Sequence, residues 1–212
     1  MALLDFGDLK PDVAPDKELV TRALTTADHV TVVGAVPALG TVLATLDRLE
    51  RLDLGVAWIP SEDPLAAGLA RSLGIDDKGR LAKASRRTLS LVRDDHGGVL
   101  LARGRLTSLA KPSGTPGPTY GRFGAQIYHD EQKVADGEIQ RVDVRPDWTA
   151  EDRLKVNVHK QLWRRGAITL GRAVQIASDE AQVEIDGVRY PRPITTWTWY
   201  ADQRFRWTLA SA

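Results

Sequence analysis

Apolar and polar positions in the first 75 residues follow two alternating patterns. Two stretches carry apolar residues every three or four positions, which predicts amphipathic helices at 17–27 and 41–52. Short apolar runs at 29–34 and 54–59 are typical of buried strands, and 3–6 is a candidate for one more strand. Because a helix connects two of these strands, we expect a parallel, right-handed βαβ unit.

A third helix is marked by signals at both of its ends. Asp63 can accept hydrogen bonds from the free N–H groups of a first turn, and Pro64 removes only a donor that this turn leaves unbonded. Leu73 is followed by Gly74, a residue that commonly ends helices in a left-handed conformation. These signals predict a helix over 64–73.

From about residue 85 onward, apolar and polar residues alternate, which indicates antiparallel strands. One hairpin is expected around the turn at 94–98, with strands at 87–93 and 99–107. The segment 111–121 is rich in Pro, Gly and Ser, so we predict a loop there. Further strands are predicted at 123–129, 138–144, 154–158, 172–177 and 182–185.

The last predicted hairpin pairs 194–200 with 204–209 and is rich in aromatic residues. Trp197 and Trp199 share one face of the first strand, and Phe205, Trp207 and Leu209 share one face of the second. These indoles are expected in the core, but an exposed surface that stacks on bases, sugars or a lipid headgroup remains an alternative. The burial of the indoles distinguishes the two.

These patterns together predict an α+β fold with two domains. A reduced α/β, Rossmann-like domain is expected at 1–84, and a larger antiparallel, β-sandwich-like domain at 85–212. The last strands of the second domain could return to the first domain.

Composition excludes several classes of protein. The chain has 29 basic and 28 acidic side chains, so it has no overall field that would attract a nucleic acid. It has no cysteine, which excludes disulfides, thiolate metal sites and thiol nucleophiles. Its four histidines are far apart in sequence, and no metal site is expected. The longest uncharged stretch, 30–46, contains Pro and Gly, so we expect no transmembrane segment and a cytoplasmic protein.

The segment from Gly34 to Thr41 joins a predicted strand to a predicted helix. A glycine-containing turn of this kind presents free N–H groups and the positive end of a helix dipole, which suits a phosphate. The segment lacks the Lys of a Walker A loop and the glycine spacing of a dinucleotide fingerprint. An ordinary strand-to-helix turn, whose glycines serve only the backbone, therefore remains the alternative.

The order of these segments resembles the catalytic domain of diacylglycerol kinases and bacterial lipid kinases, a family distantly related to NAD kinases. The stretch LARSLGI at 69–75 is similar to a Leu-Ala-Arg-x-Leu-Gly-Ile helix of that family, and VEIDGVRY at 183–190 falls where the family has Asp-Gly-Glu. The resemblance implies a nucleotide site, for which the candidates are Gly34, Gly40, Thr41, Pro60 and Ser61. ATP and Mg²⁺ are implied only if the family's activity is retained.

The sequence departs from the family pattern at the residues that carry the family's phosphate binding and catalysis. The family's phosphate loop reads Gly-Gly-Asp-Gly-Thr, and the matching residues of this chain, 37–41, read Pro-Ala-Leu-Gly-Thr. Leu39 therefore stands in place of the metal-associated carboxylate. The segment 61–64 stands where Gly-Thr is expected. Val188 follows Asp186-Gly187 where the family has its general-base Glu, and valine cannot accept a proton. The resemblance therefore implies an impaired or inactive relative with a ligand-binding or interaction role.

Two alternatives remain open. The first is an active ATP-dependent lipid kinase with an unusual site, in which Glu62, Asp63 and Asp186 are the candidate carboxylates and must converge near Gly40 and Thr41. The second is a non-enzymatic oligomeric assembly module that pairs through sheet edges or aromatic strands. The expected partners are a lipid or nucleotide ligand and a second copy or another protein, and the protein could lie peripherally at a membrane.

Overall fold

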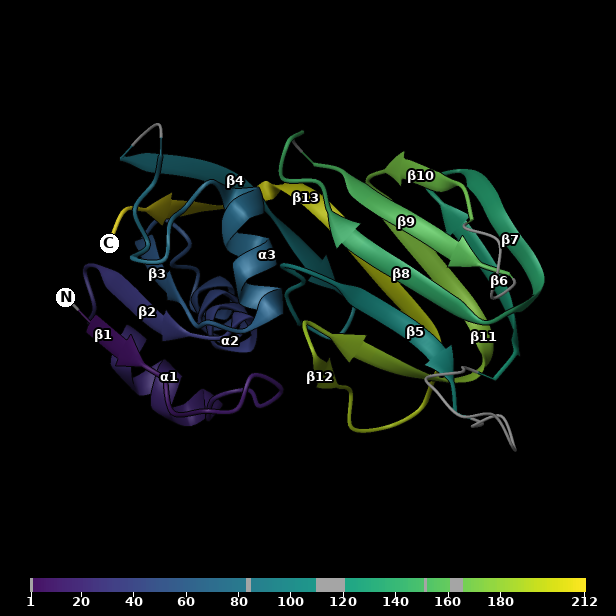
Figure 1. Ribbon diagram of the computed structural model, residues 1–212, viewed down its shortest axis with the longest axis horizontal. Coiled ribbons are helices and arrows are strands. Elements are labelled where there is room, and N and C mark those ends of the chain that lie inside the picture. The colour runs from purple at the N-terminus through teal and green to yellow at the C-terminus, as the bar shows by residue number, and fades with distance from the viewer. Residues whose placement is uncertain (1, 83–84, 110–120, 151, 161–165) are drawn as a thin grey trace.

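The computed structural model describes residues 2–82, 85–109, 121–150, 152–160 and 166–212. The molecule has two parts side by side, and the three helices of the described chain all lie in the N-terminal part (Figure 1). A single hydrogen-bonded network of 13 strands runs through both parts. The predicted α+β class is confirmed, and strands dominate the architecture.

The N-terminal part is built on three parallel strands, β1 (Ala2–Asp5), β2 (Val30–Gly34) and β3 (Gly55–Pro60). Helix α1 (Lys17–Leu24) connects β1 to β2, and helix α2 (Val36–Arg48) connects β2 to β3. The predicted parallel βαβ unit is therefore present.

Helix α3 (Pro64–Leu73) has the bounds predicted from its end signals. The Oδ1 atom of Asp63 accepts hydrogen bonds from the backbone N–H groups of Leu65 and Ala66, at 2.9 and 3.0 Å. Gly74 ends the helix with a φ of 75°, in the left-handed region that favours glycine.

Helix α2 begins five residues earlier than predicted. Ala35 precedes its first turn and gives no side-chain cap, and Pro37 lies within that turn, where a missing N–H costs nothing. The helix is held by buried apolar residues from Val36 to Leu46 rather than by a capping signal. Gly40 and Thr41 are therefore interior helix residues, and the prediction of a long turn from Gly34 to Thr41 is wrong.

The C-terminal part consists of antiparallel strands in two layers. In Figure 1, β5 (Gly104–Ser108), β8 (Arg141–Pro146), β9 (Leu154–His159) and β10 (Ile168–Gly171) lie in front of the later strands. The other strands are β4 (Arg86–Asp94), β6 (Phe123–His129), β7 (Gln132–Ile139), β11 (Ala173–Ile185), β12 (Val188–Arg189) and β13 (Ile194–Ala210).

Several predicted strands are joined or paired differently. The segment 138–144 spans the junction of β7 and β8, and the two strands predicted at 172–177 and 182–185 form the single strand β11. The predicted hairpin around 94–98 is limited to one bridge, between Arg93 and Val99. Strand β5 pairs with β11 and β8 and not with β4. The loop predicted at 111–121 lies outside the described residues except for its last residue.

The predicted last hairpin is one long strand, β13. The polar residues after Ala201 form a bulge rather than a turn, because the pairing with β4 shifts between Asp202 and Arg206. The first half of β13 pairs with β11, and its end pairs in parallel with β3. The last strand of the chain thus enters the sheet of the N-terminal part.

Two apolar cores share this strand. Trp207 lies in one core with Trp58, and Trp197 and Trp199 lie in the other, and all four side chains have 0% exposure. The idea of an exposed aromatic stacking surface is therefore wrong. In the described part of the chain no helix is long and apolar enough to cross a membrane.

Candidate ligand-binding cleft

A cleft of about 610 Å³ opens between the two parts of the molecule. The segments that follow β1 and β3 contribute to it, so it lies toward the carboxyl ends of the parallel strands, where open sheets of this kind bind ligands. Its walls come from segments far apart in sequence: the start of α3, the segment before β5, the turn between β11 and β12, and the end of β8. The polar and small residues along it are Asp12, Asp63, Gly68, Ser72, Arg103, Arg145 and Gly187.

Asp63 lies at the cleft but uses both of its carboxylate oxygens within its own segment. One oxygen caps α3, and the other accepts a hydrogen bond from the Ser61 hydroxyl at 2.7 Å. Glu62 is exposed and does not line the cleft. Neither acid is placed as a free carboxylate facing a ligand.

Asp186 is the most deeply buried acid near the cleft, with 2% exposure. Its carboxylate accepts backbone N–H bonds from Leu101, Ala102 and Arg103 at 2.8–2.9 Å. Burial raises the pKa of Asp186 to about 6, although these three bonds and the Arg103 charge oppose the shift. The side chain therefore holds the segment 101–103 in place beside the cleft.

The turn at Asp186 and Gly187 has the local conformation needed for a tight hairpin. Both residues have positive φ values, 51° and 92°, which a two-residue Asp-Gly turn between paired strands requires. Val188 follows as the first residue of β12. An aliphatic side chain thus follows the Asp-Gly turn directly.

Two arginines give the cleft its positive charge. Arg103 is half-buried and forms an ion pair with Glu184, with an N–O distance of 3.2 Å. Arg145 is exposed at the end of β8 and makes no ion pair with any described residue. Guanidinium groups bind phosphate and carboxylate through paired N–H donors, so this side of the cleft suits an anion. The sequence offered no signal for either arginine, because both positions depend on the sheet pairing.

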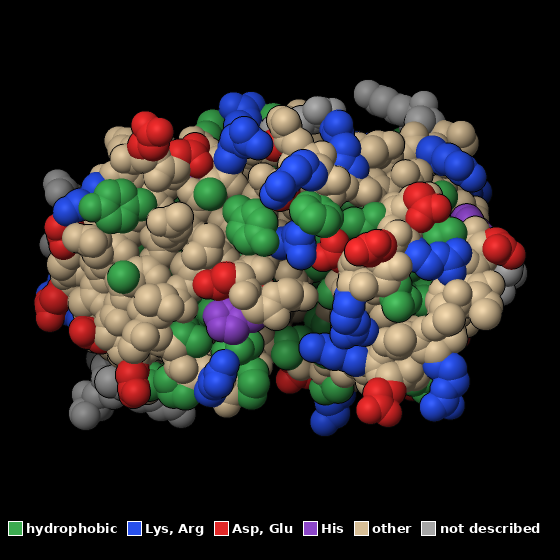
Figure 2. Space-filling view, turned by 180° about the vertical axis from the view of Figure 1, so that it is seen from behind, with side chains coloured by type: hydrophobic (Ala, Val, Ile, Leu, Met, Phe, Trp, Pro, Cys, Tyr) green, Lys and Arg blue, Asp and Glu red, His purple; other side chains and the backbone are tan. Residues whose placement is uncertain are grey.

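A second, smaller groove of about 200 Å³ lies on the other side of the Asp186 turn. Gly40 and Thr41 line it together with Asp186, and Lys17, His96 and Tyr190 stand around it. Seen from behind, the molecule is hollowed between its two parts, with basic, histidine and apolar side chains around the hollow (Figure 2).

Gly40 and Thr41 have no loop geometry that would bind a phosphate. Thr41 is buried, and its hydroxyl donates to the carbonyl oxygen of Pro37 at 2.9 Å. The actual strand-to-helix turn is at Gly34, whose carbonyl oxygen accepts bonds from the Trp58 indole at 3.0 Å and from the Ser61 N–H at 3.1 Å. A side chain at Gly34 would meet the Phe6 backbone at 3.2 Å, so glycine is needed there for close packing.

The three candidate carboxylates do not meet at Gly40 and Thr41. Asp186 lines the small groove with them, whereas Asp63 lines the larger cleft and Glu62 lines neither. Pro60 ends β3, and Ser61 bonds to Asp63 and Gly34 as described above. The other candidate nucleotide residues are therefore held by contacts within the protein.

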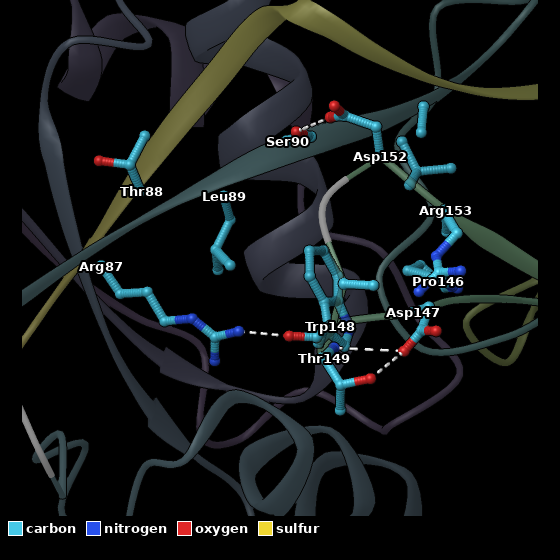
Figure 3. A pocket seen from close by; sticks show the side chains of 13 residues that line it. Arg87, Thr88, Leu89, Ser90, Pro146, Asp147, Trp148, Thr149, Asp152 and Arg153 are labelled. Carbon is cyan, nitrogen blue, oxygen red and sulfur yellow. Dashed lines mark hydrogen bonds between the residues drawn. The ribbon is translucent and has the colours of Figure 1, made fainter. Parts of the chain in front are cut away.

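A third cavity, of about 110 Å³, lies between β4 and residues 146–150, 152 and 153 (Figure 3). The Ser90 hydroxyl donates to Asp152, Arg87 donates to the carbonyl oxygen of Trp148, and Thr149 donates to Asp147 at 2.6 Å. The first two bonds tie the connection between β8 and β9 to β4, and the third lies within that connection. They account for a structural role of the polar residues in this cavity.

One turn brings metal-type side chains together. Ligand atoms of Asp94, Asp95 and His96 lie within 4.8 Å of one another, which no other group of three such residues in the described chain does. Asp94 accepts the N–H bonds of His96 and Gly98 at 2.9 and 2.7 Å, so it closes the turn itself. Burial raises the pKa of Asp94, although these bonds oppose the shift.

Comparison with solved structures adds the fold relationship. A diacylglycerol kinase-like protein from Bacillus anthracis strain Sterne superposes with a TM-score of 0.68 at 14% identity, covering 94% of this chain and 84% of that one. The chain has the fold of the diacylglycerol kinases. A second diacylglycerol kinase structure from the same organism has a TM-score of 0.65 at 15% identity, covering 92% and 82% of the two chains.

The same fold extends to the NAD kinases. An NAD kinase from Archaeoglobus fulgidus, solved in complex with ATP, has a TM-score of 0.56 at 14% identity and covers 93% of this chain and 81% of that one. No protein-family model and no curated protein matches the sequence. The resemblance inferred from the order of segments is confirmed at the level of the fold.

Proposed function

We propose that this diacylglycerol kinase-like protein binds a phosphate-bearing lipid or nucleotide in the larger cleft and transfers phosphoryl groups poorly or not at all. The observation that carries the proposal is the commitment of Asp186. Asp186 matches the Asp of the family's Asp-Gly turn. Its carboxylate already accepts hydrogen bonds from three backbone N–H groups of the protein itself.

The case for a bound ligand rests on the shape and charge of the cleft. About 610 Å³ is in the range of sites for small ligands, and the position toward the carboxyl ends of parallel strands is typical of open sheets. Arg145 stands free of ion pairs with described residues and Arg103 lies near it, so an anionic group would find guanidinium donors.

The case for impaired transfer rests on the acids. Phosphoryl transfer needs carboxylates that hold metal ions and a group that orients or deprotonates the acceptor. Asp63 accepts hydrogen bonds from the first turn of its own helix, and Asp186 accepts them from the distant segment 101–103. Val188 offers no proton acceptor. Asp12 is the other acid along the cleft, and it is exposed. ATP and Mg²⁺ would serve the protein only if activity survives.

A substitution at Gly68 tests the proposal sharply. A Cβ at Gly68 would meet no atom within 4 Å, and the residue lines the cleft, so Gly68→Trp fills the cleft without a clash at its base. Gly68→Ala is the control, because it also replaces the glycine inside α3 with a better helix former but does not fill the space. Titration calorimetry with ATP, ADP and a short-chain phosphatidic acid measures binding by each form.

We expect the wild-type protein and Gly68→Ala to bind at least one of these ligands, and Gly68→Trp to bind it at least tenfold more weakly. A kinase assay with ATP, Mg²⁺ and diacylglycerol in micelles should show no turnover above background. Turnover would contradict the impaired chemistry, and equal affinity of the two Gly68 variants would contradict the cleft as the site.

One observation keeps the assembly role as a second candidate. Strands β1 and β10 are at the two ends of the strand order, and Leu3 on β1 is 60% exposed. Open strand edges with apolar side chains can pair with a second copy. Light scattering over a concentration series tests this, and a monomer at high concentration would contradict it.

A further inference from the structure

The outer face of the front layer carries a cluster of basic side chains. On β8 and β9 the inward residues are buried and apolar, so Arg141, Arg145 and Lys155 point outward together with Arg105 of the neighbouring β5. We call the outward side of β5, β8, β9 and β10 the basic sheet face; Figure 1 views the molecule from the side on which these strands lie in front.

This face has a net positive charge in a nearly neutral protein. Asp143 forms ion pairs with Arg105 and Arg141 at 3.0 and 2.8 Å, and Asp147 pairs with Lys155 at 2.9 Å. The four basic residues therefore exceed the two carboxylates by two charges, whereas the whole chain carries +1. These six residues therefore give the face a local excess of positive charge.

Two aliphatic side chains stand at the edge of the same face. Ile168 and Leu170 on β10 are 63% and 53% exposed. Ile168 lies opposite Asn157 and Leu170 lies opposite Lys155, so both share the outward side with the basic residues. Strand β10 ends the strand order, so it forms an open edge of the sheet.

We propose that the basic sheet face docks on an anionic phospholipid bilayer, with Ile168 and Leu170 entering the interface. Basic residues near an anionic leaflet each contribute to attraction, and apolar side chains beside them add burial in the interface. Arg145 belongs both to this face and to the rim of the larger cleft. Docking therefore brings the cleft next to the membrane surface, which goes beyond the proposed binding function.

A lipid surface fits this face better than a nucleic acid does. Platforms for single strands use aromatic rings on which bases stack. The outward positions of the described strands carry His159 as their one aromatic ring, and its contacts to Asp143 and Arg141 hold it within the charge cluster.

Vesicle sedimentation tests the proposal with the whole 212-residue chain and no added cleft ligand. Vesicles of phosphatidylcholine and phosphatidylglycerol at a ratio of 7:3 are compared with pure phosphatidylcholine, at 0.1 and 0.5 M salt. We expect binding only to the anionic vesicles, at least tenfold weaker at the higher salt, because screening shortens the reach of surface charges.

Two variants of the face are compared with two controls. Lys155→Gln should weaken binding about fivefold, the effect of one basic residue near such a surface. Ile168→Ser with Leu170→Ser should weaken it by roughly the same factor. The controls are Lys78→Gln for charge and Leu3→Ser with Leu19→Ser for exposed apolar residues, since Leu3 and Leu19 are 60% and 55% exposed away from this face. They should bind like the wild type.

Four results would overturn the proposal: equal binding to neutral vesicles, no binding to either kind, equal losses in the controls, or tighter binding to an RNA oligonucleotide than to anionic vesicles. The variant Gly68→Trp separates this proposal from the cleft. It should keep full vesicle binding, and a loss there with unaffected face variants would assign membrane affinity to the cleft instead. Thermal melting of each variant confirms that a loss of binding is not a loss of folding.

Discussion

Asp63 and Asp186 both lie near the larger cleft, and both accept hydrogen bonds from backbone N–H groups. They differ in how far along the chain these partners lie. Asp63 caps residues two and three positions ahead of it. Asp186 binds residues 83–85 positions away and is almost fully buried. The first acid shapes one helix end, and the second joins two distant segments of the fold.

This difference shows why an acid at a position that matches a family motif need not take part in a reaction. A carboxylate that satisfies one buried and two partly buried donors cannot leave them without losing these bonds where water has little access. The deeper acid is therefore expected to matter most for stability and least for chemistry.

The largest effect is expected from Asp186→Ala. The substitution leaves three N–H groups unpaired and places alanine at a φ of 51°, so we expect a loss of about 4 kcal/mol in the free energy of unfolding. Urea denaturation measures it. Asp186→Asn keeps an acceptor oxygen and tolerates this φ, so its loss should be less than half as large. Equal losses in the two variants would refute the hydrogen-bonding explanation.

The second largest effect is the pH dependence of stability. Because the pKa of Asp186 is about 6 in the folded protein and near 3.8 when unfolded, the folded state holds the proton more tightly. Stability should therefore fall as the pH rises from 4 to 6, by about 3 kcal/mol at 1.36 kcal/mol per pKa unit, and then level off. Urea midpoints from pH 4 to 7.5 test this. Asp186→Asn should remove this part of the slope, and parallel profiles would contradict it.

A smaller effect is expected at the helix cap. Asp63→Ala should cost about 1 kcal/mol, the usual value of an N-cap side chain. Asp63→Ser retains a capping oxygen and should lose only a few tenths. A loss from Asp63→Ala as large as that from Asp186→Ala would remove the distinction between local and long-range acids.

The smallest effect is expected at Glu62. This residue is exposed and has no hydrogen bond to another described residue, so Glu62→Gln should change the free energy of unfolding by less than about 0.5 kcal/mol. Calorimetric affinity for the cleft ligand should also be unchanged. A tenfold loss of affinity would bring Glu62 back as a site residue.

The elements that were predictable from sequence carry their signals locally. Helix α3 has a capping Asp, a first-turn Pro and a terminal Gly within its own 12 residues, and its bounds agree with the prediction. Strands β2 and β3 were predictable from short apolar runs, because strands in the middle of a parallel sheet are covered on both faces.

The errors come from elements without such signals. Helix α2 starts after Ala35, which gives no capping side chain, so its apolar first turn was taken for part of a loop. In β13 the polar residues from Asp202 suggested a turn, but pairing with β4 on one side holds them as a bulge within one strand. In both cases the structure of the segment is set by contacts with distant parts of the chain and not by its local sequence.

The site was predictable only in part. Asp186 could be singled out from the sequence because it forms an Asp-Gly pair with Gly187. Its partners at 101–103, however, are brought to it only by the pairing of β5 with β11. The arginines of the cleft follow from the same pairing. Side chains brought together by a sheet register leave no pattern in a single sequence.

The path of β13 has a consequence for how the protein is made. The strands it pairs with, β3, β4 and β11, all leave the ribosome before it does. Until β13 arrives, β3 has one unpaired edge and each core lacks at least one of its buried tryptophans. The nascent chain therefore passes through a state in which β3 has an open edge. In that state both apolar cores are incomplete, and β13 completes both of them.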